Sequence, residues 1–224
     1  MNSKFAVIQS LMLLSYIWVL LLITGLSVLP HGQAVGQVSG ESTELDQLRG
    51  MLEDGHVFHA KMIHRFYDSY TEETQETEGE IWITKDQYKV TVEHQSVLVD
   101  GDISRVYNSA QNKLVISEYE PAEDDFAPSR FFSETEDIYQ VEERYKEDNA
   151  TVFVLTSDDP FELFLRVVVR LDEDLRPLEV EAIDQMENRV HTYFRESEFL
   201  SEHATDKIFQ LRYPDDAQII DLRE

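Results

Sequence analysis

The sequence predicts a mainly β protein (α+β) built on one continuous antiparallel sheet, with a few short helices lying against it. Three observations carry this prediction. Apolar side chains recur with a period of two over about ten short segments. Turns rich in Asp, Asn and Gly separate these segments, and the chain has no heptads and no internal repeat. Because strands twist, a sheet of this many strands has to curl or close.

One amphipathic helix is predicted before the first strand. Its apolar residues recur at helical spacing: Leu45, Leu48, Met51 and Leu52. Ser42 or Thr43 is placed to cap its start, and Gly55 follows its end. A loop with a short helix is predicted over Pro121 to Tyr139. Two helical segments are too few for a separate domain, so we expect them to cover the concave face of the curled sheet.

The alternating pattern begins at residue 58. It predicts strands over 58–66, 79–84, 88–93, 96–99, 104–107, 113–118, 140–146, 151–155, 161–171, 177–183, 189–198 and 208–213. A polar turn is predicted over 71–78, and tight turns at Asp100-Gly101-Asp102 and Asp148-Asn149. We expect the last of these strands, at 208–213, to complete the sheet.

The N-terminal segment has the pattern of an export signal. Lys4 is followed by no Asp, Glu, Lys or Arg before Glu41, and the stretch Leu11 to Leu29 is almost wholly apolar. Small residues follow, with Ala34 and Gly36 at cleavage spacing. We predict a cleaved signal peptide over 1–36 and one domain over 37–224. Since about 18 apolar residues can also span a bilayer, a retained inner-membrane anchor is the alternative.

The composition excludes several classes of function. The chain has 45 Asp and Glu against 19 Lys and Arg, a net charge of -26. This argues against nucleic acid and anionic lipid surfaces, which both select basic patches. The charge is interpreted as a solvated surface, with an acidic docking patch as the alternative. The absence of cysteine excludes disulfides, a thiolate metal site and a cysteine nucleophile, and also a lipid-modified cysteine.

No pattern indicates an active site, and we expect no enzyme activity, cofactor or metal. His56 and His59 begin a strand and should point to different faces, so they make a poor metal site. No serine lies in a Gly-x-Ser-x-Gly setting, and no glycine-rich phosphate loop exists. The triplet Asn149-Ala150-Thr151 fits a glycosylation acceptor but also a hairpin turn. An exported hydrolase with an unrecognised site is the remaining enzymatic alternative.

The most conspicuous feature is the supply of aromatic and branched apolar residues on the predicted strand faces. For any one of them, packing in an ordinary core is the simplest interpretation. The alternative is that some of these faces line a cavity for an acyl chain or another apolar ligand. Curled sheets with apolar interior faces commonly build such cavities.

Several short motifs follow the predicted helix in order. They are Phe58-His59-Ala60-Lys61-Met62, Gly79-Glu80-Ile81-Trp82-Ile83-Thr84-Lys85, Tyr88, Val97-Leu98-Val99-Asp100-Gly101-Asp102, Arg105-Val106-Tyr107-Asn108, Phe209-Gln210-Leu211-Arg212-Tyr213-Pro214 and Ile219-Ile220-Asp221. In the order and spacing of these motifs, the sequence resembles the outer-membrane lipoprotein carrier proteins, the LolA family. The resemblance covers about 42–223.

The resemblance implies an unclosed antiparallel half-barrel of about ten or eleven strands, with helices covering an apolar cavity. It also implies a monomeric periplasmic carrier that shields lipoprotein acyl chains between the two membranes and does no covalent chemistry. The implied partners are acylated lipoproteins, an ATP-driven release complex of the inner membrane and an acceptor at the outer membrane. The alternative is an exported module of the same shape that binds another lipid, or acts as a sensor.

Carried over to this sequence, the acyl-chain cavity is expected to be lined by Phe58, Met62, Phe66, Trp82, Tyr88, Phe131, Phe132, Leu163, Leu165, Val167 and Val169. Family members often have Arg-Pro after the Trp strand, where the Arg holds the lid or contacts the release complex. Lys85-Asp86 stands here instead, and Lys keeps the charge but not the planar fork. The acidity and the long apolar N-terminus are two further departures.

Overall fold

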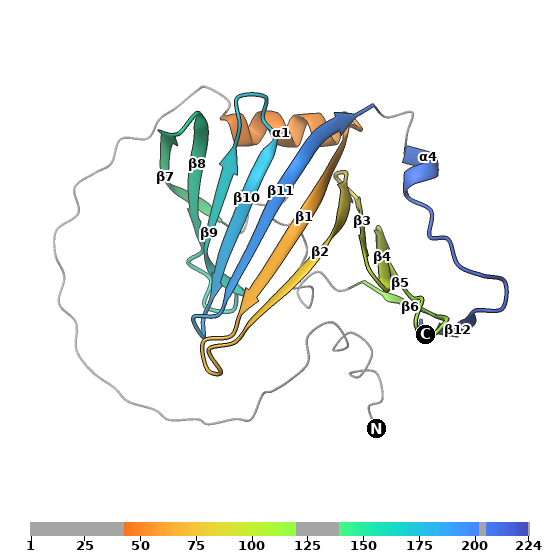
Figure 1. Ribbon diagram of the computed structural model, residues 1–224. Helices are drawn as coiled ribbons and strands as arrows, with labels where there is room; N and C mark the ends of the chain where they lie inside the picture. Colours follow the sequence, from red (N-terminus) through yellow and green to blue (C-terminus); the bar gives the residue numbers. More distant parts are fainter. Residues whose placement is uncertain (1–42, 120–138, 202–204, 224) are drawn as a thin grey trace. The chain divides into compact units, whose positions relative to one another are not determined.

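One sheet of 12 strands dominates the described part of the chain (Figure 1). The structure is a computed structural model that describes residues 43–119, 139–201 and 205–223. The chain divides after residue 41, and all described residues belong to the second unit, 42–224. In chain order the elements are α1 (Glu44–Glu53), β1 (Val57–Tyr67), β2 (Thr74–Ile83), β3 (Gln87–Val92), β4 (Gln95–Asp100), β5 (Ile103–Asn108), β6 (Lys113–Glu118), β7 (Gln140–Glu147), β8 (Ala150–Thr156), β9 (Phe164–Leu171), β10 (Pro177–Asp184), β11 (Arg189–Leu200), α4 (Thr205–Ile208) and β12 (Gln218–Asp221).

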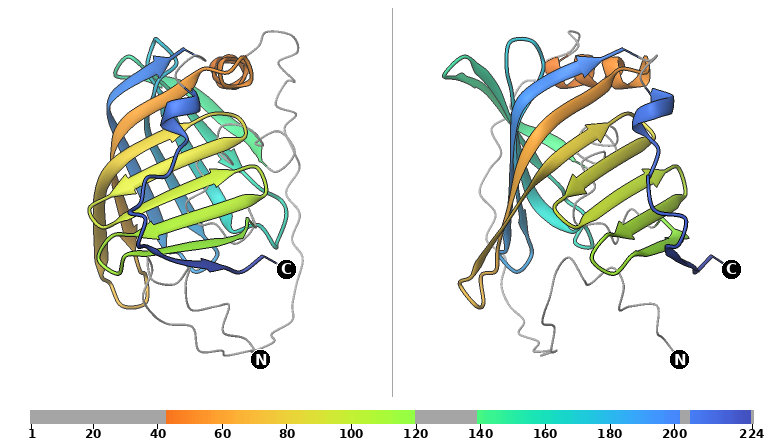
Figure 2. Two further views of the ribbon diagram at one scale, coloured as in Figure 1. Left: turned by 90° about the vertical axis from the view of Figure 1, so that its right-hand side faces the viewer. Right: turned by 45° about the vertical axis from the view of Figure 1, so that its right-hand side comes forward.

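The sheet consists of two meanders joined at its centre. The strand order is β12-β6-β5-β4-β3-β2-β1-β11-β10-β9-β8-β7, so the first meander runs from β1 to β6 and the second from β7 to β11. The junction is the antiparallel pairing of β1 with β11, which extends from Val57 opposite Leu200 to Tyr67 opposite Arg189. The edge strands β12 and β7 are not paired with each other, and the two halves curve toward one another (Figure 2). This confirms the unclosed, curled antiparallel half-barrel.

Helix α1 forms where the leucine spacing predicted it. The Thr43 hydroxyl accepts a hydrogen bond from the Asp46 N–H at 3.2 Å, and the Asp46 carboxylate accepts one from the Thr43 N–H at 2.7 Å. This capping box satisfies two backbone N–H groups at the helix start. The same helix buries Leu45, Leu48 and Leu52 against the sheet, so burial as well as capping stabilises it.

The core lies on the face of the sheet that α1 covers. Along β1, Phe58, Ala60 and Met62 are buried, whereas Lys61 and Arg65 are exposed. This period of two matches the pattern that predicted the strand. One continuous apolar cluster combines α1 with strands of both meanders. The two halves of the sheet therefore share a single core.

Two predicted boundaries are wrong for physical reasons. Strand β2 begins at Thr74, although 71–78 was expected to be a turn. Its first residues are mostly exposed and polar, so they carry no apolar alternation, yet they pair with the end of β1. The segment 208–213 was expected to be the closing strand. Instead, α4 ends at Ile208 and the sheet ends with β12, which pairs in parallel with β6.

Residues 209–217, here named the C-terminal strap, run across β3 to β6 on the side of the sheet that faces away from the core (Figure 2). Lys89 on β3 donates hydrogen bonds to the carbonyls of Ile208 at 2.9 Å and Gln210 at 3.1 Å. The rings of Tyr107 and Tyr213 lie 6.0 Å apart. The carbonyls where α4 meets the strap thus bind a side chain, and not a neighbouring strand.

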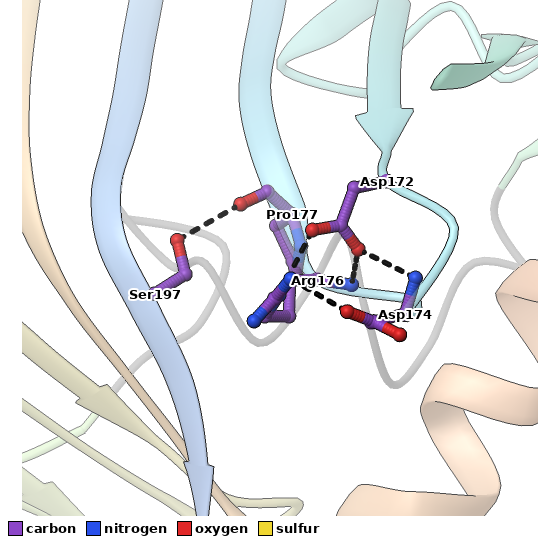
Figure 3. A network of polar contacts seen from close by, with 5 residues as sticks. All are labelled: Asp172, Asp174, Arg176, Pro177 and Ser197. Carbon is purple, nitrogen blue, oxygen red and sulfur yellow. Dashed lines mark hydrogen bonds and ion pairs between the residues drawn. The ribbon is translucent and has the colours of Figure 1, made fainter. Parts of the chain in front are cut away.

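Aspartate and asparagine side chains shape the turns between strands. Asp148 and Asn149 both have positive φ, 47° and 63°, as a two-residue hairpin turn between β7 and β8 requires. Between β9 and β10, the Asp172 carboxylate accepts hydrogen bonds from the backbone N–H groups of Asp174 at 2.9 Å and Arg176 at 2.8 Å (Figure 3). The Arg176 guanidinium also binds this carboxylate, so the turn is held from two directions.

Candidate functional site

The candidate site is the apolar face beneath α1, here named the inner face. Its buried strand residues are Phe58, Ala60, Met62, Ile81, Ile83, Tyr88, Val90, Val99, Phe153, Leu155, Phe164, Val167, Val169, Leu171, Val180, Ala182, Val190 and Phe194. No charged side chain belongs to this set. A surface built from these side chains can bury apolar groups.

Six apolar side chains around the inner face are only partly buried: Phe66, Val92, Val97, Tyr119, Leu163 and Phe199. They pack against the buried cluster and keep part of their surface accessible. An added apolar group can contact them without displacing a core side chain. These residues are here named the rim.

The structure brings together most of the residues that the sequence proposed for the cavity. Phe58, Met62 and Tyr88 are at most 3% exposed and belong to the buried cluster. Val167 and Val169 also belong to this cluster, whereas Phe66 and Leu163 belong to the rim. Phe131 and Phe132 lie outside the described residues.

Trp82 lies on the opposite side of the sheet, here named the outer face. Its neighbours Ile81 and Ile83 point into the core, and a strand alternates its side chains. The Trp82 ring stacks on His59 at a centroid distance of 5.0 Å, and Lys89 Nζ lies 5.3 Å from the Trp82 ring centre.

Leu165 also lies outside the inner face, with 42% of its surface exposed. The register between β9 and β10 shifts at this point, since Ile183 is opposite Arg166 and Asp184 is opposite Phe164. One residue of β9 is therefore extra, and Phe164 takes the buried position. Strict alternation from Leu163 to Val167 could not reveal such a bulge.

Polar contacts at both ends of α1 tie it to the two halves of the sheet. At its start, the Glu44 carboxylate accepts hydrogen bonds from Arg144 on β7 and from Thr151 on β8. Burial alone would raise the pKa of Glu44, but its backbone hydrogen bond and Arg144 outweigh burial and hold that pKa below its usual value. At its end, Lys85 Nζ donates to Glu53 Oε1 at 3.1 Å. Lys85, proposed as a lid contact, thus binds the helix that covers the inner face.

One titratable side chain lies among the apolar residues of β1. His64 is 9% exposed, and its Nδ1 lies 3.0 Å from the hydroxyl oxygen of Thr192 on β11. Burial lowers the pKa of His64 to about 4, so its imidazole is neutral near pH 7. The inner face therefore carries no ionised imidazole at that pH.

The described residues contain no group of three or more His, Asp or Glu arranged to hold a metal ion. His56 and His59 do not converge: His56 Nδ1 lies 3.1 Å from the Met51 carbonyl, and His59 Nδ1 lies 3.1 Å from Glu198 Oε1. Among the same residues, no helix has the length and apolar character needed to cross a bilayer.

No protein-family model matches the chain, and no curated protein matches it. Solved structures do. A conserved protein from Thermus thermophilus is 15% identical with a TM-score of 0.50, and the match covers 80% of this chain and 97% of that one. A LolA superfamily protein from Nitrosomonas europaea is 10% identical with a TM-score of 0.43, over 76% and 99% of the two chains. A putative outer membrane lipoprotein-sorting protein domain from Vibrio parahaemolyticus is 16% identical with a TM-score of 0.39, over 74% and 97%.

All three of these structures are at most 16% identical to this chain. At these identities the likeness is one of fold. The fold itself is the open, curled antiparallel half-barrel that was expected from the sequence.

Proposed function

We propose that this protein is an exported carrier, which shields the acyl chains of lipoproteins on its inner face between the inner and outer membranes. One observation supports this most: both meanders and α1 contribute to a single apolar surface. The sheet that carries this surface is open, because its edge strands β12 and β7 do not pair with each other. Burial of an acyl chain there gains about 0.8 kcal/mol for each methylene. In this proposal, residues 1–36 are a cleaved signal peptide and the carrier works in the periplasm.

Rim residues are the proposed first contacts of the acyl chain, since they keep accessible surface. The buried residues Phe58, Met62, Val167 and Val169 are already packed, so an acyl chain reaches them only when covering groups move. In this proposal α1 is the lid. Its contact with Lys85 joins two half-exposed side chains, an arrangement that contributes little stability and breaks easily.

The proposed cycle contains no covalent step. An ATP-driven release complex of the inner membrane supplies the lipoprotein, and an outer-membrane acceptor receives it. Binding has to be reversible, which a surface that makes only apolar contacts allows. The second candidate is an exported module that binds a free lipid or acts as a sensor, since the inner face would accept any apolar chain.

Solvent extraction of the exported protein, followed by mass spectrometry, separates these candidates. Co-purified acylated protein is the result expected of a carrier. Free lipid alone would favour the lipid-binding or sensor module. If neither is extracted and a fluorescent acyl-chain analogue also fails to bind, both proposals are wrong.

Matched substitutions test where the acyl chain lies. Phe66→Glu and Leu163→Glu place a carboxylate at the rim and should abolish uptake of the fluorescent analogue, because burial of an unpaired charge is unfavourable. Tyr67→Glu, next along β1, and Leu178→Glu, on the exposed side of β10, are the controls and should bind normally. Near-ultraviolet circular dichroism verifies that each variant folds. Normal uptake by folded rim variants would show that the ligand lies elsewhere.

A further inference from the structure

Three loops lie side by side at the end of the sheet away from α1 (Figure 1). They are the β1–β2 loop (68–73), the β8–β9 loop (157–163) and the β10–β11 loop (185–188). Ser69 joins the first to the third, since its N–H donates to Asn188 Oδ1 at 2.9 Å and its hydroxyl to the Met186 carbonyl at 2.6 Å. Gln185 joins the third to the second by donating to the carbonyls of Pro160 at 2.6 Å and Glu162 at 3.1 Å.

Each of the three loops presents one large apolar side chain to solvent. Tyr70 is 90% exposed, Phe161 is 92% exposed and Met186 is 47% exposed. These residues are here named the tips. Single apolar residues on a surface are ordinary, but three on loops that hydrogen bonds hold together form a defined patch.

The same device holds each tip in place. An aspartate two residues earlier accepts the tip's backbone N–H. The distance is 2.9 Å from Asp68 to Tyr70, 2.9 Å from Asp159 to Phe161 and 2.8 Å from Asp184 to Met186. The backbone under each exposed side chain is thus fixed by its own turn, so ordering the tips on binding costs little entropy.

The aspartate-capped turn does not itself require an apolar residue at the tip position. In the turn between β9 and β10, Asp172 accepts the N–H of the residue two positions later in the same way (Figure 3). That residue is Asp174, which is polar and binds Arg176. The turn therefore accepts a polar residue at the tip position, and Tyr70, Phe161 and Met186 are not needed to form it.

The loops that carry the tips are acidic. Residues 68–73, 157–163 and 184–188 contain no Lys or Arg, and their carboxylates are Asp68, Glu72, Glu73, Asp158, Asp159, Glu162, Asp184 and Glu187. Glu72, Glu73, Asp158 and Glu187 are exposed. A surface of this kind repels anionic lipid, whereas it attracts a cationic protein surface.

We infer that the three tips form a docking surface for a protein partner whose apolar pockets are framed by Lys and Arg side chains. Aromatic side chains on a preordered backbone anchor protein interfaces, and the surrounding carboxylates select the charge of the partner. This surface does not depend on acyl-chain binding, since the tips lie on the loops and not on the inner face. It adds a protein contact to the proposed carrier and holds equally for the lipid-binding alternative.

The test compares the full chain with two triple variants. The tip variant carries Tyr70→Ser, Phe161→Ser and Met186→Ser, and leaves the turn aspartates intact. The control variant carries Val141→Ser, Tyr145→Ser and Ile219→Thr, which are exposed residues of the edge strands β7 and β12. The probe is a fluorescent amphipathic peptide of lysine and leucine, and its dissociation constant is measured by anisotropy at two salt concentrations.

We expect the wild type and the control variant to bind the peptide alike, and the tip variant to bind at least about tenfold more weakly. Binding to the wild type should weaken as salt increases. Equal binding by the tip variant, or no binding by the wild type, would overturn the inference. Phosphatidylcholine vesicles are the second probe: vesicle binding that requires the tips, without peptide binding that requires them, would assign the surface to a membrane and reject a protein partner.

Discussion

At the scale of single residues, Gly79 shows why one position of β2 lacks a side chain. A Cβ atom at this position would lie 2.9 Å from Val92 Cγ1 and closer still to the Thr91 carbonyl oxygen. Real Cβ atoms do not approach other atoms so closely, and a backbone oxygen cannot turn away as a side chain can. Gly79 thus permits the close approach of β2 and β3.

Gly79→Ala should lower the free energy of unfolding by about 1–3 kcal/mol, because β2 and β3 would have to separate. Gly50→Ala is the matched control. Gly50 lies within α1 with nothing within 4 Å of the added Cβ, so alanine should raise the stability by about 0.5–1 kcal/mol. Urea denaturation of both variants measures whether the free energy of unfolding falls for Gly79→Ala and rises for Gly50→Ala. A Gly79→Ala variant as stable as the wild type would mean that the sheet relaxes there without penalty.

His64 makes the stability depend on pH in one direction. Burial lowers its pKa to about 4, below the value of about 6.5 in the unfolded chain. The unfolded state therefore binds the proton more tightly. The contribution of His64 to stability is complete above about pH 6.5 and is lost as the pH falls toward 4.

His64→Gln should remove this part of the acid sensitivity, since glutamine can still bind the Thr192 hydroxyl but does not titrate. Between pH 7 and pH 4, the wild type should lose on the order of 3 kcal/mol more than the variant. Unfolding by urea at several pH values measures the difference. The control is His94→Gln in an exposed turn, which should follow the wild type. If the stability of wild type and of His64→Gln depended on pH in the same way, burial of His64 would not be a cause of the acid sensitivity.

Alternation in the sequence predicted the direction of some side chains and not of others. In β3, Tyr88 and Val90 are separated by Lys89, so the apolar face was unambiguous. In β2, Trp82 stands between Ile81 and Ile83, and both faces look apolar. The period alone cannot decide which of them faces the core. The structure resolves this by covering Trp82 with His59 and Lys89.

At the scale of elements, the C-terminal strap forms a second, smaller packing layer on the outer face. Leu98, Tyr107 and Leu114 are buried but do not belong to the inner-face cluster. The ring of Tyr213 in the strap lies against that of Tyr107. Residues 208–213 alternate as a strand does, which explains the wrong prediction. Ile208, Phe209 and Leu211 are only partly buried and Tyr213 is exposed, and the pattern could not show that the carbonyls bind Lys89.

Lys89→Met should loosen the strap. Methionine keeps the length of the side chain but cannot donate to the carbonyls of Ile208 and Gln210, and we expect a loss of about 1–2 kcal/mol. Trypsin should then cleave faster after Arg212, within the strap. Lys113→Met at the start of β6 is the control. Unchanged cleavage at Arg212 would show that the ring contact and β12 hold the strap without Lys89.

At the scale of the whole molecule, the charge opposes the fold. A net charge of -26 on 224 residues repels itself in the compact state more than in the unfolded chain. Raising the salt concentration from about 0.02 M to about 0.5 M shortens the screening length from roughly 20 Å to roughly 4 Å. The melting temperature should therefore rise by about 2–8 °C. Sodium and potassium chloride should act equally, and a melting temperature independent of salt would show that the carboxylates are too dispersed to matter.

The open half-barrel itself could be predicted, but not the way in which its halves meet. Periodicity indicated many antiparallel strands, and the resemblance to a known family implied that the sheet does not close into a barrel. No local signal indicated that β1 pairs with β11, because a continuous meander would have the same alternation. Distant strands recognise each other through shared burial, as Phe58 and Phe194 do with their rings 5.5 Å apart. A sequence pattern confined to one strand does not contain this information.

The central pairing of β1 with β11 also determines when the chain can finish folding. Tyr67 pairs with Arg189, so the middle of the sheet waits for a segment that follows roughly 120 residues later. A chain that crosses a membrane with its N-terminus first presents β1 early and β11 almost last. Until β11 has emerged, half of the inner face has no counterpart, and β1 to β6 form only an incomplete layer. For a carrier exported as proposed, this topology would delay completion of the sheet until translocation is nearly over, while the chain can still be threaded.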